Sequence, residues 1–160
     1  MRYGRIAHHD VPRPDCEAPR VMELRVAAYG IVTGERGLLL AHWRQGDRSG
    51  WTLPGGGIDP GEHPADAVRR EVEEETGYLV SVGQLLGVDS HVIPAAERAI
   101  GRATDLHALR IVYRAEVVGG ELRHEVAGST DQAGWFSPAE VDRLDRVPLV
   151  DIGRGFAGLG

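Results

Sequence analysis

One segment of the sequence, "GGGIDPGEHPADAVRREVEEETGY" (residues 55–78), constrains the fold most, because three glycines lead into a strongly acidic stretch. Seven of its residues are Asp or Glu. Pro64 is at a position expected in the first turn of a helix, where a missing N–H costs no hydrogen bond. Gly77 is at the position just past the helix end, where a left-handed backbone conformation is common. The segment therefore predicts a helix over 64–76 that follows a glycine break.

The carboxylates of this helix do not all point the same way. At 100° per residue, with Glu71 set to zero, Glu75 lies near +40° and Glu74 near −60°. Glu73 lies about 200° away, where we interpret it as solvated surface. An apolar stripe borders the acidic one and consists of Ala65, Val68 and Val72. The acidic stripe is thus expected at the edge of the buried face.

Three like charges within one helical turn repel one another, so a cation beside them would be stabilising. Mg²⁺ and Mn²⁺ prefer carboxylate and carbonyl oxygens, and Mg²⁺ is often completed by substrate phosphates. The stripe therefore indicates a divalent metal site and phosphate chemistry. The other interpretation is a charged helix that serves solubility alone.

The spacing of the segment resembles the Nudix box of the Nudix hydrolase family. The matching positions are Gly56, Glu62, Arg70, Glu71, Val72, Glu74, Glu75 and Gly77. Tyr78 departs from the usual aliphatic residue but is still apolar. The stretches 51–56 and 135–141 also resemble the family, and the resemblance covers about residues 24 to 144. It implies hydrolysis of a nucleoside diphosphate linked to another group, with Mg²⁺ or Mn²⁺.

The expected fold class is α/β, a Nudix-type α/β/α sandwich with a central mixed β-sheet. The residue pattern agrees, since it predicts strands over 21–32, 36–43, 78–90 and 107–118 and a last helix over 137–144. We interpret residues 46–50 and 89–105 as loops, the second of which could determine specificity. Residues 1–20, rich in proline and charge, are expected to form an N-terminal arm, and residues 21–160 a single domain.

The resemblance also implies roles for individual residues. Glu71, Glu74 and Glu75 would bind the metal, with the Gly56 carbonyl as a further ligand. Glu62 and Arg70 would brace these ligands as a charge pair.

The general base and the substrate contacts are less constrained by the sequence. The base is Glu74 or Glu75 of the helix, or Glu125 or Asp131 from a later segment, and the sequence does not choose among them. For the substrate, Arg44 is a candidate phosphate contact and Trp51 a candidate for stacking on a base, although structural roles are the other interpretation of both.

Composition limits the partners. The formal net charge is −6 and no Lys/Arg cluster offsets it, which argues against nucleic-acid binding. The short apolar stretches and the polar beginning favour a cytoplasmic protein without a membrane partner. We therefore expect a small nucleotide-type substrate, and a homodimer is compatible with the sequence. The single cysteine, Cys16, excludes an internal disulfide.

Two other functions are considered. The first is a nucleotide-binding or sensing module that keeps the fold without catalysis, which the complete set of box carboxylates disfavours. The second is isopentenyl-diphosphate isomerisation, for which the family requires a cysteine in the site, whereas Cys16 lies in the expected arm.

Overall fold

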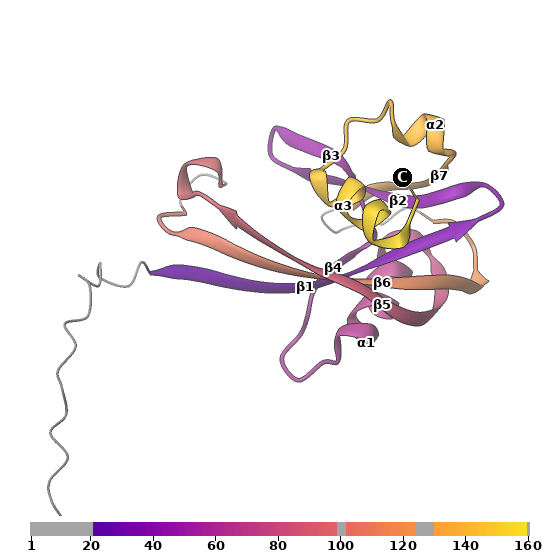
Figure 1. Ribbon diagram of the computed structural model, residues 1–160, viewed down its shortest axis with the longest axis horizontal. Helices are drawn as coiled ribbons and strands as arrows, with labels where there is room; N and C mark the ends of the chain where they lie inside the picture. Colours follow the sequence, from indigo (N-terminus) through magenta and orange to yellow (C-terminus); the bar gives the residue numbers. More distant parts are fainter. Residues whose placement is uncertain (1–20, 99–101, 124–129, 160) are drawn as a thin grey trace, which may run out of the picture.

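A computed structural model describes residues 21–98, 102–123 and 130–159. The expected arm over 1–20 and the candidate base Glu125 lie outside these residues. Seven strands form the sheet: β1 Met22–Gly34, β2 Gly37–Gln45, β3 Arg48–Thr52, β4 Gly55–Gly57, β5 Tyr78–Ile93, β6 Asp105–Gly120 and β7 Thr130–Phe136. Their order is β3-β2-β1-β6-β5, with β4 paired to β1 and β7 paired to β2 (Figure 1).

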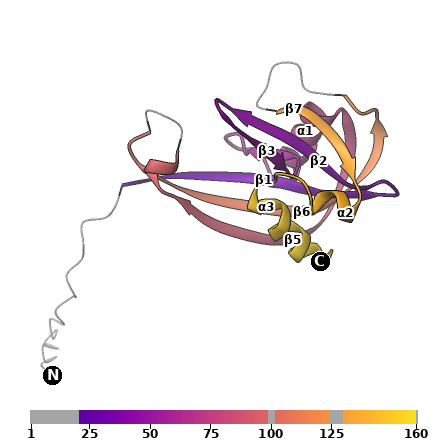
Figure 2. The ribbon, with the colours of Figure 1, turned by 90° about the horizontal axis from the view of Figure 1, so that it is seen from above.

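The sheet is mixed because β1 and β6 run parallel while every other named strand pair is antiparallel. Helix α1 (Pro64–Thr76) covers one face, and α2 (Pro138–Val141) with α3 (Pro148–Ala157) covers the other (Figures 1 and 2). A short 3-10 turn, η1 (Ala95–Glu97), lies between β5 and β6. The predicted α/β/α arrangement with a mixed sheet is confirmed.

Side chains of β1 point alternately to the two faces of the sheet, so this strand contributes to two hydrophobic cores. Ala28 and Val32 pack with Val68 and Val72 of α1. Ile31, which points to the opposite face, belongs to a second core that includes residues of α2 and α3. Successive strand residues point to opposite faces, so a fully buried central strand reads as a continuous apolar run.

Several predicted boundaries were wrong. The expected loop over 89–105 is shorter than predicted, because β5 continues to Ile93 and β6 begins at Asp105. The expected loop over 46–50 contains the start of β3, and the three glycines pair with β1 as β4 rather than breaking the sheet. The last predicted helix ends at Val141, and α3 was not predicted. None of the helices in the described ranges is long and apolar enough to cross a membrane.

Candidate active site

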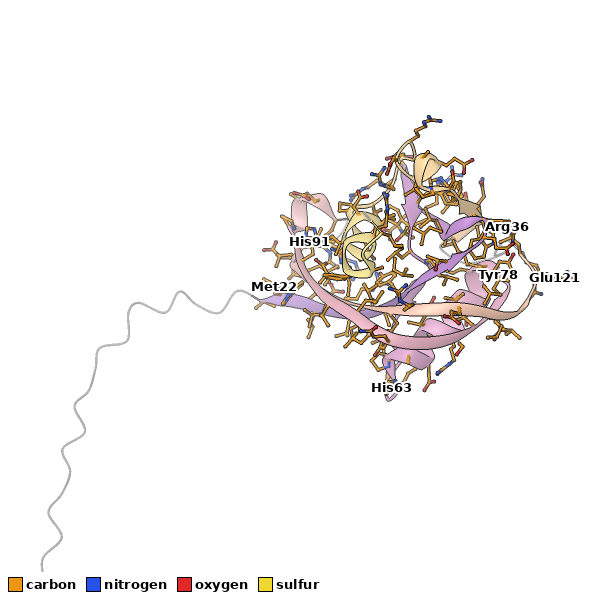
Figure 3. All side chains as sticks on the ribbon, turned by 45° about the vertical axis from the view of Figure 1, so that its right-hand side comes forward. Met22, Arg36, His63, Tyr78, His91 and Glu121 are labelled. Carbon is orange, nitrogen blue, oxygen red and sulfur yellow. The ribbon has the colours of Figure 1, made fainter. Side chains whose placement is uncertain are left out.

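Helix α1 is fixed at both ends by its own sequence. His63 caps its start, since Nδ1 accepts a hydrogen bond from the Ala65 N–H at 3.1 Å. Gly77 ends it at a φ of 75° and donates its N–H to the Glu73 carbonyl. Figure 3 shows His63 at one end of the domain and Tyr78, beside Arg36, well away from it. The acidic stripe therefore lies on a helix whose start and end are both fixed by hydrogen bonds.

Strand β4 holds two of the carboxylates against the sheet. The Gly55 N–H donates a 2.9 Å hydrogen bond to Glu75 Oε2, and Glu75 is only 5% exposed. A Cβ on Gly56 would lie 2.7 to 2.8 Å from the carboxyl atoms of Glu71. Real Cβ atoms do not approach so closely, so the Glu71 carboxylate occupies the space that any side chain at position 56 would need.

Arg70 contacts three carboxylates of the site, those of Glu62, Glu71 and Glu74. Its Nε and Nη2 each donate to one oxygen of Glu62 at 2.9 Å, and Nη2 also donates to the Gly57 carbonyl at 3.0 Å. Its Nη1 donates to Glu71 Oε1 at 2.8 Å and reaches Glu74 Oε2 at 3.5 Å. A bidentate guanidinium with charged partners fixes geometry as well as charge. The predicted bracing contact between Glu62 and Arg70 is present.

These contacts shift the ionisation of the acidic groups. The hydrogen bond from Arg70, together with the Asp59 N–H, lowers the pKa of Glu62 to about 2. Hydrogen bonding to Glu62 raises the pKa of Arg70. Burial raises the pKa of Glu71, and Arg70 acts in the opposite direction. Glu74 and Glu73 are exposed, so the stripe runs from solvent at Glu74 to the interior at Glu75.

The strand register points the Gly56 carbonyl away from this stripe. Hydrogen bonds from the Gly30 N–H to the Pro54 carbonyl and from the Ile58 N–H to the Val26 carbonyl flank the pair formed by Ala28 and Gly56. In an antiparallel pair of strands, hydrogen-bonded and non-hydrogen-bonded residue pairs alternate. Ala28 and Gly56 therefore also form a hydrogen-bonded pair, in which the Gly56 carbonyl is directed toward β1. Gly55 instead has its polar groups on the outer edge of β4, where its N–H contacts Glu75. This geometry does not support the Gly56 carbonyl as a metal ligand.

The carboxylate oxygens of Glu71, Glu74 and Glu75 are suitable ligands for a hard divalent cation, but they do not surround a single position. Within the described ranges, no group of three or more His, Cys, Asp or Glu side chains converges on one metal position. Arg70 lies between Glu71 and Glu74 instead. The carboxylates fit Mg²⁺ or Mn²⁺ in type and in their location on one stripe.

The other candidate residues gather on strands β2, β3 and β7. Asp131 Oδ1 is 2.6 Å from His42 Nδ1, and Asp131 Oδ2 is 3.9 Å from Arg44 Nη1. The hydrogen bond to His42 lowers the pKa of Asp131. The Trp51 ring packs between His42 and Phe136, with centroid distances of 5.2 and 4.6 Å. Thus Asp131 contacts residues of β2, and Trp51 packs against two neighbouring rings.

His42 was not among the residues predicted for the site. It pairs with Trp51 across β2 and β3, and with Gln132 across β2 and β7, next to a register shift at Trp43. It also lines a surface pocket together with Arg44, Gly46, Asp47 and Ser49. No spacing in the sequence indicates this contact, since His42 and Asp131 meet only because β2 pairs with β7.

Comparison with known proteins identifies the family. The model of the NUDIX domain matches residues 23–152, so the chain belongs to the Nudix hydrolase family. The predicted family and enzyme class are confirmed.

Two relatives and one solved structure illustrate the similarity. A Bacillus subtilis protein, named provisionally as an 8-oxo-dGTP diphosphatase, is 43% identical over 76% of this chain and 68% of its own length. An ADP-ribose pyrophosphatase from Methanocaldococcus jannaschii is 36% identical over 61% of this chain, and the match spans 54% of that relative. A NUDIX hydrolase from Nitrosomonas europaea has the same fold, with a TM-score of 0.69, 24% identity, and coverage of 86% of this chain and 90% of that one.

Proposed function

We propose that this chain hydrolyses a diphosphate bond in a nucleoside diphosphate linked to another group, and that it requires Mg²⁺ or Mn²⁺. The observation that carries the proposal is the arrangement of three carboxylates on one stripe of α1. Glu75 is held by Gly55, while Arg70 contacts Glu71 and Glu74. A helix that served solubility alone would have no reason to bury Glu75 or to pack Glu71 on a glycine.

Glu71, Glu74 and Glu75 are the proposed metal-binding side chains, and the backbone of Gly55 replaces that of Gly56 as the proposed carbonyl ligand. The bound cation would neutralise phosphate oxygens and lower the pKa of a water molecule. Glu62 and Arg70 act indirectly, since their hydrogen bonds fix where Glu71 can lie. Such supporting contacts commonly change metal affinity or activity about 10- to 100-fold.

A glutamate of α1 is the better supported general base. Asp131 is engaged by His42 and Arg44, and its lowered pKa makes it a weaker proton acceptor. Glu74 is the most exposed of the three glutamates, with a side chain 52% exposed, and can reach a water molecule. Glu125 lies outside the described residues and stays a prediction.

The names of the relatives support a nucleotide-type substrate but differ in the nucleotide. One name refers to 8-oxo-dGTP and the other to ADP-ribose. Both compounds contain a nucleoside attached to a diphosphate, which is the class proposed here.

The test is a panel of nucleoside triphosphates, nucleotide sugars and dinucleoside polyphosphates, incubated with Mg²⁺, with Mn²⁺ and with a chelator. We expect wild type to release a monophosphate or phosphate only with metal. Glu75→Gln keeps an oxygen that can accept from Gly55 but loses the charge, and kcat should fall about 100-fold or more. Glu73→Gln is the matched control, because the same change on the exposed side of α1 should leave kcat unchanged.

Metal-independent cleavage, or equal kcat values for wild type and Glu75→Gln, would contradict the proposal. Binding of a nucleotide by calorimetry without any cleavage on the panel would instead support a sensing module.

A further inference from the structure

The strands beside the glutamates carry a row of charged residues on the face opposite α1. Residues 23, 25 and 27 of β1 point away from the face on which Ala28 packs with α1. In the register, Arg25 lies opposite Ala108 of β6, and Ala27 lies opposite Arg110. Asp89 of β5 lies opposite Arg110 from the other side. Figure 2 shows β1, β6 and β5 extending together beyond the rest of the domain.

Arg25 differs from the other arginines of this region in its partners. Arg110 is paired with Asp89, and both side chains are largely buried. Arg98 is paired with Glu23, and Arg70 with Glu62. Arg25 is exposed, and among the residues that the structure describes no carboxylate lies within 4.0 Å of its guanidinium.

The guanidinium of Arg25 lies near Gly57 of β4. Its Nη2 is 4.0 Å from the position of a Cβ on Gly57, whereas a Cβ on Gly56 would point at Glu71. Arg25 and Glu71 therefore flank the two faces of β4. Gly57 also accepts the hydrogen bond from Arg70, so this glycine lies between two guanidinium groups.

Helix α1 lies over one face of β4, and β1 pairs with one of its edges. Helix α1 packs on the first face with Ala67, Val68 and Val72. A diphosphate that reaches the carboxylates must therefore lie along the outer edge of β4 or over the face of Arg25. A guanidinium binds phosphate oxygens in a bidentate manner, and an unpaired one gives up no ion pair to do so.

We propose that Arg25 binds the diphosphate group of the substrate, across β4 from Glu71. This inference rests on the proposed function, because it assumes that the substrate reaches the carboxylates.

The test measures binding rather than turnover. Inorganic pyrophosphate and ADP are titrated calorimetrically, with Mg²⁺, into wild type, Arg25→Gln, Arg25→Lys and Arg143→Gln. We expect Arg25→Gln to weaken binding of both probes about tenfold or more, and Arg25→Lys to retain part of the affinity. Arg143→Gln, which removes an exposed charge beyond α2, should bind as wild type does. Thermal melting should be unchanged in all variants, because Arg25 is exposed.

Equal affinity of wild type and Arg25→Gln would overturn the inference, and so would an equal loss in Arg143→Gln, which would indicate bulk charge alone. Failure of wild type to bind either probe would overturn it as well. If the probes bind through Arg25 but nothing on the panel is hydrolysed, the proposed function fails while this inference stands.

Discussion

Gly56 is the residue at which backbone and site are most tightly coupled. A methyl group there would meet the Glu71 carboxyl at 2.7 to 2.8 Å, so Gly56→Ala must displace that carboxylate. We expect kcat/KM to fall about 10- to 100-fold, with a higher metal concentration needed for half-maximal activity. Gly83→Ala is the control, since the nearest atom to a Cβ in that strand is the Arg114 carbonyl oxygen at 3.6 Å. An unaltered metal titration for Gly56→Ala would show that Glu71 does not act where it is packed.

Glu62 makes a contribution to stability that depends on pH. Its folded-state pKa of about 2 lies below the usual 4.5, so the pairing with Arg70 stabilises the fold above pH 4.5. That contribution is lost as pH falls toward 2, because the folded protein must then bind a proton at Glu62. The urea midpoint of Glu62→Gln should therefore be lower than that of wild type at pH 6.5, and the two midpoints should converge near pH 2.

Glu73→Gln, an exposed change on the same helix, should match wild type throughout this pH range. If the urea midpoint of Glu62→Gln is below that of wild type by the same amount at every pH, Glu62 stabilises the fold through packing instead of charge.

At the scale of elements, α3 contains two glycines with opposite surroundings. A Cβ on Gly153 would lie 2.6 Å from Leu53 Cδ1 and 3.1 Å from Ile31 Cδ1, whereas a Cβ on Gly155 would meet nothing within 4 Å. Gly153→Ala should destabilise the protein by about 1–3 kcal/mol through overpacking. Gly155→Ala should stabilise it by about 0.5–1 kcal/mol, because alanine favours a helix interior. Urea denaturation of the two variants measures both signs, and a stabilising Gly153→Ala would mean that α3 can move away from the sheet.

The same helix illustrates what sequence reasoning missed. Residues 148–157 contain two glycines and a leading proline, so local propensity gives a weak helical signal. The helix is held by tertiary packing of Leu149 and Val150 in the second core. Strand β4 was missed for a related reason, since three glycines carry no alternating pattern and only their pairing with β1 defines the strand.

The acidic stripe, by contrast, was predictable because a single helix generates it. The relative directions of Glu71, Glu74 and Glu75 follow from the helical period alone, and the structure gives Glu73 the exposed position expected from it. The contact between His42 and Asp131 and the direction of the Gly56 carbonyl both depend on pairing between distant strands. Local sequence does not encode that pairing.

At the scale of the whole molecule, β1 joins the two parts of the sheet. It pairs with β6 over most of its length and with β2 at its end. We therefore expect one cooperative unfolding transition. The three tryptophans, Trp43, Trp51 and Trp135, report on β2, β3 and β7, while far-ultraviolet circular dichroism reports on all elements. The urea curves from the two signals should coincide, and separate midpoints would show that the two parts of the sheet unfold independently.

The parallel pairing of β1 with β6 has a consequence for synthesis in the cell. Met22 lies opposite Asp105, so the strand at the centre of the sheet has its main partner far along the chain. At typical ribosome speeds, roughly 4 to 17 seconds separate the synthesis of these two residues. Throughout that interval the nascent chain presents an apolar strand that only a later segment can cover, which makes this protein a candidate client of chaperones at the ribosome exit.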